Sequence, residues 1–312
     1  MDHVTPESGN EQQAEYWSHA GGEAWVQLQE LMDRQLQPLG QAVLDAMAIQ
    51  TGESVVDIGC GCGATTMELA SSVGPTGRVV GLDISTSMVA VAARSIERAG
   101  YRFATAMVGD AQTVSGDSVG GLVDAVYSRF GVMFFADPVK AFVNIRALTK
   151  VGGRLAFVCW QPPRENGWMS NLGHALAPLF PVGPSPDPFA PGPFAFGDPV
   201  RTAGILSAAG WSDVVVEPCV RTMLLFGSNN FEEVLNGTLR IGAAARMLAG
   251  ADEATLEQVR RVARRVLEEQ WSDDGANVPG ACWLVTARHS SPNTAQNPAE
   301  HTAAADRSDR SK

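Results

Sequence analysis

The sequence predicts a doubly wound α/β fold, in which a mostly parallel β-sheet is covered by helices on both faces. Two observations lead to this prediction. Short segments that are apolar almost throughout recur along the first half of the chain, such as 54–58, 78–83 and 154–160. Between them lie stretches in which apolar residues recur every three or four positions, as on the buried side of a helix. Continuously apolar strands are buried on both faces, as in parallel sheets built from βαβ units.

The first 50 residues form a predicted N-terminal helical cap, and the α/β alternation follows it. Apolar spacing over 11–47 indicates helix, and we expect Pro38 to divide it into two helices. Two later helix starts carry capping residues, Ser85 and Asp137. The expected strands are 54–58, 78–83, 103–108, 122–127 and 154–160.

The regular alternation stops after residue 160. Residues 161–200 hold ten of the 18 prolines together with several aromatic residues, so we expect a lid rather than a solvated linker. One domain is expected over 51–287, with lid insertions at about 161–200 and 227–275. The polar stretch 288–312 is expected to be a disordered tail. The remaining expected elements are helices over 200–209, 231–248 and 252–271 and strands over 213–217 and 281–286.

The composition excludes several classes of protein. With 45% hydrophobic residues, the 312-residue chain can bury a sizeable core. Its net charge of −11 disfavours binding to phosphate backbones, so we expect no nucleic-acid partner. No apolar run approaches the ~20 residues of a membrane helix, so we expect no membrane insertion. The start of the chain has no signal-peptide pattern and the five cysteines form no disulfide framework, so we expect a cytoplasmic protein.

A glycine-dense loop after the first expected strand is the first indication of a site. Gly59, Gly61 and Gly63 stand between that strand and a helix, where glycine permits a sharp turn and close approach of a ligand. The pattern alone is weak, because Gly59, Gly61 and Ala64 also satisfy the dinucleotide-binding pattern G-x-G-x-x-G/A.

Three carboxylates distinguish between possible ligands of this loop. Asp57, Asp83 and Asp110 lie at the carboxyl ends of the first three expected strands, where α/β sheets bind ligands. Asp57 suits an ammonium group rather than a phosphate, and Asp83 can accept hydrogen bonds from two ribose hydroxyls. Asp110 can accept from an adenine amino group while the Ala111 N–H donates to the ring. Together they predict a cationic, amino-acid-bearing adenosine without phosphate.

The segments that carry these residues resemble the class I S-adenosylmethionine-dependent methyltransferases. The similarity is strong over about residues 50–160, in 55–63, 81–85, 109–111 and 150–155, although Cys62 stands where Thr or Ser is commoner in the family. The resemblance implies a Rossmann-like sheet of seven strands whose last strand is antiparallel, with S-adenosylmethionine as cofactor. The cofactor-binding residues it implies are Asp57, Gly59, Gly61, Gly63, Asp83, Ile84, Asp110, Ala111 and Ser128.

Other segments point to a small-molecule acceptor. The N-terminal aromatic residues and segment 128–135 resemble a bacterial subgroup akin to enzymes that methylate quinones and secondary metabolites. The fourth strand lacks the Asp/Asn-Pro-Pro-Tyr/Phe motif of enzymes that methylate amino groups of nucleic acids and glutamine. We therefore expect an apolar or aromatic acceptor, methylated on oxygen or carbon. The expected substrate and lid residues are Tyr16, Trp17, Phe130, Trp160 and Trp168.

Two histidines are candidate general bases. His174 lies in the expected lid and His19 near the N-terminal aromatic residues, whereas His3, His289 and His301 fall in segments expected to be disordered. Catalysis by positioning alone remains open. We expect no metal, because the Cys60/Cys62 pair has no second pair of ligands at metal-binding spacing.

Two alternative functions also remain open. A non-catalytic relative would bind the cofactor without methyl transfer, and an oxidoreductase would bind NAD at the same glycine loop. The sequence specifies neither the acceptor's scaffold nor an oligomeric state.

Overall fold

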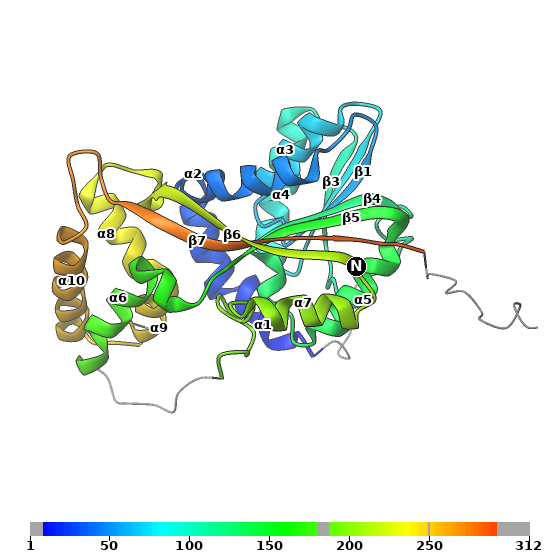
Figure 1. Cartoon of the computed structure of the whole chain (residues 1–312). Coiled ribbons are helices and arrows are strands. Elements are labelled where there is room, and N and C mark those ends of the chain that lie inside the picture. The colour runs from blue at the N-terminus through cyan, green and yellow to red at the C-terminus, as the bar shows by residue number, and fades with distance from the viewer. Residues whose placement is uncertain (1–8, 180–186, 249, 292–312) are drawn as a thin grey trace, which may run out of the picture.

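The computed structural model describes residues 9–179, 187–248 and 250–291 of the chain. In this part of the chain, seven strands form one sheet in the order β3-β2-β1-β4-β5-β7-β6 (Figure 1). Strands β1 to β5 pair in parallel, whereas β7 is antiparallel to both β5 and β6. The predicted fold class is confirmed. The strands are β1 (Ser54–Ile58), β2 (Arg78–Asp83), β3 (Ala104–Val108), β4 (Val123–Arg129), β5 (Thr149–Trp160), β6 (Ser212–Leu224) and β7 (Asn277–Arg288).

The helices cover both faces of the sheet and extend beyond one end of it. Helix α2 packs against α3 and α4, and α5 packs against α7. Helices α6, α8, α9 and α10 pack on one another beyond the sheet, and we call them the helical cluster (Figure 1). None of the described helices combines the length and apolar character needed to cross a membrane. The helices are α1 (Glu11–Ser18), α2 (Ala20–Met47), α3 (Ala64–Val73), α4 (Thr86–Ala99), α5 (Pro138–Leu148), α6 (Gly167–Leu176), α7 (Pro199–Ala208), α8 (Phe231–Arg240), α9 (Gly242–Leu248) and α10 (Glu253–Glu268).

The predicted caps form as the sequence indicates. The Ser85 hydroxyl accepts from the Met88 N–H at 3.3 Å and begins α4. The Asp137 carboxylate accepts from the Lys140 N–H at 2.9 Å and begins α5, with a proline at the first helical position. Each side chain satisfies a backbone donor that the first helical turn leaves unpaired.

The predicted break at Pro38 is wrong. Helix α2 continues through Pro38, and the N-terminal stretch is divided at His19 instead. Proline removes one backbone hydrogen bond from a helix interior and crowds the preceding turn. The buried side of α2 is apolar on both sides of that position, with Leu36, Leu39 and Val43 almost fully buried. Packing of this face therefore outweighs the local cost of the proline.

Several elements differ in length from those expected. The expected lid 161–200 contains α6, and its residues 180–186 lie outside the described part of the chain. Strands β6 and β7 are longer than the sequence indicated and pair over most of their length. The first residues of the stretch expected to be a disordered tail are ordered: Arg288 ends β7, and the His289 N–H donates to the Gly153 carbonyl at 3.0 Å. Residues 292–312 lie outside the described residues.

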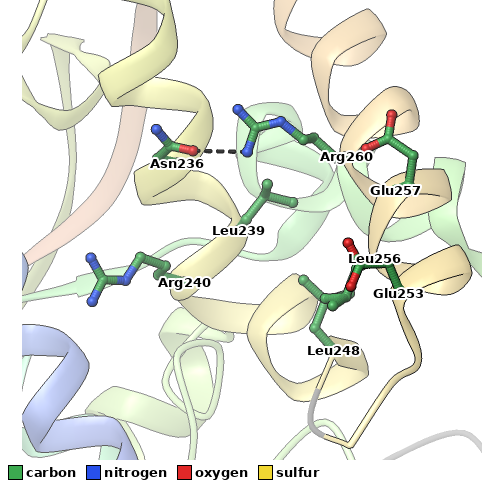
Figure 2. A pocket seen from close by; sticks show the side chains of 8 residues that line it. All are labelled: Asn236, Leu239, Arg240, Leu248, Glu253, Leu256, Glu257 and Arg260. Carbon is green, nitrogen blue, oxygen red and sulfur yellow. Dashed lines mark hydrogen bonds between the residues drawn. The ribbon is translucent and has the colours of Figure 1, made fainter.

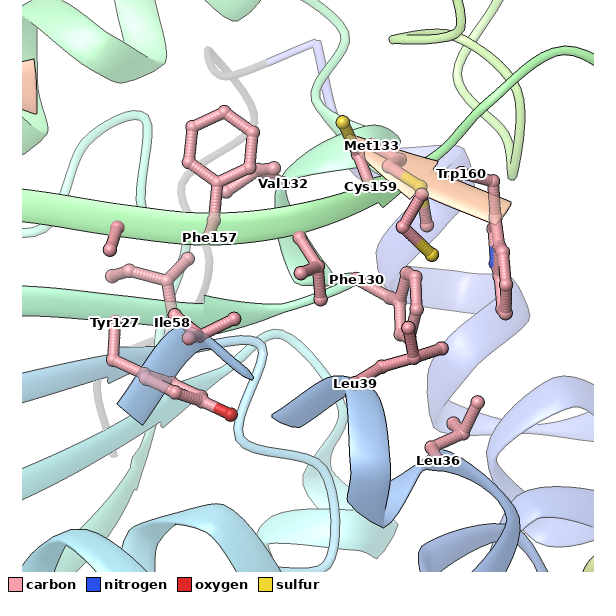
Figure 3. Packing of buried hydrophobic residues seen from close by; sticks show 14 of the residues in the cluster. Leu36, Leu39, Ile58, Tyr127, Phe130, Val132, Met133, Phe157, Cys159 and Trp160 are labelled. Atoms are coloured by element: carbon pink, nitrogen blue, oxygen red, sulfur yellow. The ribbon is translucent and has the colours of Figure 1, made fainter. Parts of the chain in front are cut away.

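The hydrophobic core joins the sheet to the N-terminal helices. Figure 3 shows buried side chains from α2, β1, β4 and β5, among them Leu39, Ile58, Tyr127 and Phe157. This packing fixes α2 along one face of the sheet, with Asp33 beside Arg129 at the carboxyl end of β4. It thereby closes one side of the space into which the loops after β1 to β4 project.

Candidate active site

One cavity of about 560 Å³ lies at the carboxyl ends of the parallel strands, between the N-terminal helices and the helical cluster. Its volume is in the usual range of small-molecule sites, roughly 300–1,000 Å³. Its position is where open α/β sheets bind ligands. The structure brings most of the predicted site residues together in its lining: Tyr16, Trp17, Gly59, Gly61, Asp83, Ile84, Asp110, Ala111, Phe130, Trp160 and Trp168.

The glycine loop combines two different uses of glycine. Gly59 has φ +69°, and a Cβ there would lie 2.5 Å from the Gly131 Cα, so the loops after β1 and β4 touch only because both residues lack a side chain. Gly61 has φ +54° and faces open space, with no atom closer than 3.8 Å to an added Cβ. Gly63 does not line the cavity; its Cβ would meet Ala92 of α4 at 2.9 Å, so it permits helix packing.

Asp83 is placed to accept hydrogen bonds from a ligand. One carboxylate oxygen accepts from the Gly61 N–H at 2.8 Å and the other from the Ser85 N–H at 2.9 Å. A carboxylate has about four acceptor positions, so each oxygen keeps one for a ligand hydroxyl. The side chain is 7% exposed, and its burial raises the pKa of the carboxyl.

Asp110 is held by a contact that the sequence did not predict. The Asn10 side-chain amide donates to both carboxylate oxygens, at 3.0 and 3.1 Å, and the Gln112 N–H donates to one of them. Asn10 also accepts from the Ala136 N–H at 2.8 Å. Ala111 also lines the cavity, and its N–H has no acceptor among the described residues. The N-terminal segment is therefore tied over the end of β3.

Asp57 lies behind the glycine loop rather than in the cavity lining. It is fully buried, and one carboxylate oxygen accepts from the Thr65 and Thr66 hydroxyls, both at 2.7 Å. The other oxygen is buried without a hydrogen-bond partner among the described residues. Burial raises the pKa of Asp57 to about 6. The direct contact with a ligand that the sequence predicted is not seen, because β1 turns this side chain toward α3.

Ser128 joins the loops after β1 and β4. Its hydroxyl donates to the Ile58 carbonyl at 2.7 Å and accepts from the Gly131 N–H at 3.1 Å. It is fully buried and does not line the cavity. Ser128 was predicted to bind the cofactor, but it lies behind the residues that line the cavity.

An ion pair in the lining was missed by the sequence analysis. Arg129, the last residue of β4, donates to Asp33 of α2 at 2.7 Å, and both line the cavity next to the glycine loop. The positive charge at the end of an apolar strand was the available signal for Arg129. Nothing local marks Asp33 or Asn10, since their partners lie about 100 residues away in the sequence.

Aromatic side chains form much of the remaining wall. Phe130 and Trp160 are stacked, with ring centroids 4.3 Å apart, and Trp168 meets Trp160 edge-on at 5.6 Å. On the N-terminal side, Trp17 packs edge-on against Tyr16 and other rings. Phe130 has φ +66°, a backbone conformation that costs a non-glycine residue energy and that is concentrated at functional sites.

The two candidate bases do not reach the cavity. His174 in α6 and His19 between α1 and α2 are both exposed, and neither belongs to the lining. His289, which was expected to be disordered, lies instead beside the Thr149 carbonyl, with its Nδ1 at 2.7 Å. Among the described residues, no group of three His, Cys, Asp or Glu side chains is arranged to hold a metal ion.

Comparison with known proteins gives consistent matches. Residues 55–153 match the family model described as a methyltransferase domain. The chain is 34% identical over 144 residues to aklanonic acid methyltransferase from Streptomyces sp. (strain C5), covering 46% of this chain and 64% of that protein. It is 31% identical over 193 residues to nocamycin O-methyltransferase from Saccharothrix syringae, covering 57% and 65%. The matches thus span somewhat less than two thirds of each relative.

Solved structures share the fold at low sequence identity. The [4+2]-cyclase SpnF matches with a TM-score of 0.54 at 15% identity, covering 93% of this chain and all of that one. At this identity the likeness concerns the fold alone.

Proposed function

We propose that this chain, which belongs to the class I S-adenosylmethionine-dependent methyltransferases, transfers the methyl group of that cofactor to a small apolar or aromatic acceptor. The observation that carries the proposal is Asp83, a buried carboxylate with a free acceptor position on each oxygen beside the open Gly61 loop. This arrangement suits the two hydroxyls of a ribose.

The residues present fit S-adenosylmethionine. Asp83 would hold the ribose, and Asp110 with the Ala111 N–H would hold the adenine. Arg129, which lines the cavity near the glycine loop, is already paired with Asp33, so no free cation stands there for a pyrophosphate among the described residues. When bound, the cofactor supplies an electrophilic methyl group on a sulfonium. Transfer of that methyl group leaves a neutral thioether, so the leaving group needs no proton.

The chain's own contribution is to bind the acceptor, orient it and exclude water. The stacked Phe130 and Trp160 rings and the edge of Trp168 offer an apolar wall to a planar molecule. Holding a nucleophile against the methyl group lowers the activation barrier by about 7–11 kcal/mol in favourable cases. No described histidine lines the cavity, so we propose that positioning, rather than a histidine base, carries the reaction.

The names of the relatives support an acceptor of low molecular weight. Aklanonic acid and nocamycin appear in the names of the two relatives above, and the second is an O-methyltransferase. The chain has a net charge of −11, which disfavours nucleic acid as the methyl acceptor. Methylation on oxygen or carbon therefore remains our proposal.

Isothermal titration of the wild type should give a micromolar Kd for S-adenosylmethionine. Asp83→Ala should weaken binding at least about 100-fold, because two hydrogen bonds to a charged group are each worth roughly 1.5–3 kcal/mol. Asp198→Ala is the matched control, since Asp198 also accepts from two backbone N–H groups but at α7, outside the cavity. An unchanged affinity in both Asp83→Ala and Asp83→Asn would refute the ribose assignment.

Turnover requires a separate measurement. Host extracts incubated with the protein and a deuterated methyl donor should yield a labelled small molecule that mass spectrometry detects. Cofactor binding without any labelled product would select the non-catalytic alternative. Binding of NAD without binding of S-adenosylmethionine would select the oxidoreductase.

A further inference from the structure

Arg240 differs from the other charged residues of the cavity lining. Asp83 and Asp110 accept hydrogen bonds from the protein, and Arg129 is paired with Asp33. Arg240 lines the same cavity from the last turn of α8, yet it has no hydrogen bond or ion pair with any described residue. Its guanidinium therefore keeps five N–H donors available.

The surroundings of Arg240 offer carboxylates that it does not use. Figure 2 shows a second pocket, between α8 and α10, which Arg240 also lines. There Arg240 extends from α8 away from Glu253 and Glu257 of α10, whereas Arg260 of α10 donates to Asn236. A cation near a helix carboxyl end interacts favourably with the helix dipole. That effect accounts for a positive charge in this turn. Arg240 is exposed, so water solvates its guanidinium in the free protein, and a ligand anion in the cavity would replace that water.

Trp168 of the helical cluster also lines the cavity, but its one polar hydrogen does not face it. The indole N–H of Trp168 in α6 is buried and has no acceptor among the described residues. Two other polar side chains from this side donate to backbone carbonyls four residues earlier: the Thr238 hydroxyl to Val234 and the Gln270 amide N–H to Val266. Arg240 therefore supplies the positive charge that the helical cluster contributes to the lining.

We propose that Arg240 selects acceptors that carry an anionic group, such as a carboxylate, on an apolar or aromatic framework. This inference rests on the proposed methyltransferase function and specifies its substrate class. The guanidinium fork binds a carboxylate through two parallel hydrogen bonds. It also supplies local attraction for an anion in a protein whose net charge of −11 otherwise repels one.

A matched pair of fluorescent probes tests the proposal without methyl transfer. The anion 8-anilinonaphthalene-1-sulfonate and the neutral N-phenyl-1-naphthylamine share one framework and differ in the sulfonate. Both are titrated into the full chain saturated with S-adenosylhomocysteine. Arg240→Gln should weaken binding of the anion at least about fivefold, since the site is partly open to solvent, and change the neutral probe less than twofold. Arg240→Lys should recover part of the loss.

Two further variants control the experiment. Arg98→Gln removes an exposed arginine from the last turn of α4, which also has no partner among the described residues but lies outside the cavity, and should change neither probe. Ala245→Phe fills the cavity and should weaken both probes. Equal effects of Arg240→Gln on the two probes, no effect on the anion, or insensitivity of both probes to Ala245→Phe would overturn the proposal.

The outcome is separable from that of the proposed function. Probe selectivity depends on Arg240 and the cavity, whereas the cofactor assignment depends on Asp83. Selectivity for the anion together with an Asp83→Ala variant that still binds S-adenosylmethionine would leave the anion site standing and remove the ribose assignment.

Discussion

At the scale of a single side chain, Asp57 carries an electrostatic cost. Its pKa rises to about 6 from an ordinary value of 3.8, chiefly because burial disfavours the charged form. The Thr65 and Thr66 hydroxyls and the Arg129 charge oppose this effect only in part. The unfolded chain therefore loses its proton at lower pH than the folded chain, and the contribution of Asp57 to stability falls as pH rises from about 4 to about 6.

Replacing the carboxylate should expose this cost. Between pH 4 and pH 7 the wild type should lose roughly 3 kcal/mol of stability relative to Asp57→Asn, as a shift of about two pKa units implies. We measure this as the difference between the free energies of unfolding of the variant and the wild type, which should grow as pH rises. Urea unfolding at several pH values measures the difference. A difference independent of pH would show that Asp57 titrates normally in the folded protein. Weaker binding of S-adenosylmethionine by the same variant at pH 7 would indicate that the buried charge is kept for a cationic ligand.

At the scale of an element, α2 contains a proline whose local cost is offset by packing. Pro38→Ala should restore a backbone hydrogen bond and relieve crowding at Arg34 while making the unfolded chain more flexible. We expect a net gain of about 1–2 kcal/mol in the free energy of unfolding. Urea unfolding measures it, with Gln37→Ala, an exposed neighbour in the same helix, as control. A loss of stability would mean that the fold requires the bend that Pro38 imposes.

The helix that passes through Pro38 also shows the limit of sequence reasoning about elements. Local signals were sufficient where one side chain acts on its own turn, as at the Ser85 and Asp137 caps. They failed at Pro38 and did not locate the helix within the expected lid, because packing against distant elements decides which residues of those stretches are helical. Helix α6 packs against α9 and α10, which follow it by 60 residues or more along the chain.

At the scale of the whole molecule, the cavity is assembled from three parts of the chain. The sheet supplies the glycine loop and Asp83, which strand ends made predictable. The N-terminal segment supplies Asn10 and Asp33, and the helical cluster supplies Arg240. None of these last three was predicted, because their roles depend on contacts between segments far apart in sequence. The glycine loop and Asp83 could be predicted because parallel strands end at one edge of the sheet. The other three residues could not, because tertiary packing brings them to the cavity.

Because all three parts line one cavity, cofactor binding should stabilise the molecule as a unit. At a concentration 100 times its Kd, a ligand adds about 2.7 kcal/mol to the free energy of unfolding. For a large domain this corresponds to a rise in Tm of about 5–10 °C. Thermal unfolding with S-adenosylmethionine or S-adenosylhomocysteine should show this rise in the wild type and in Asp198→Ala, but not in Asp83→Ala at the same concentrations. A larger rise with NAD would contradict the cofactor assignment. A rise confined to one of two separate transitions would show that the cavity does not couple the three parts.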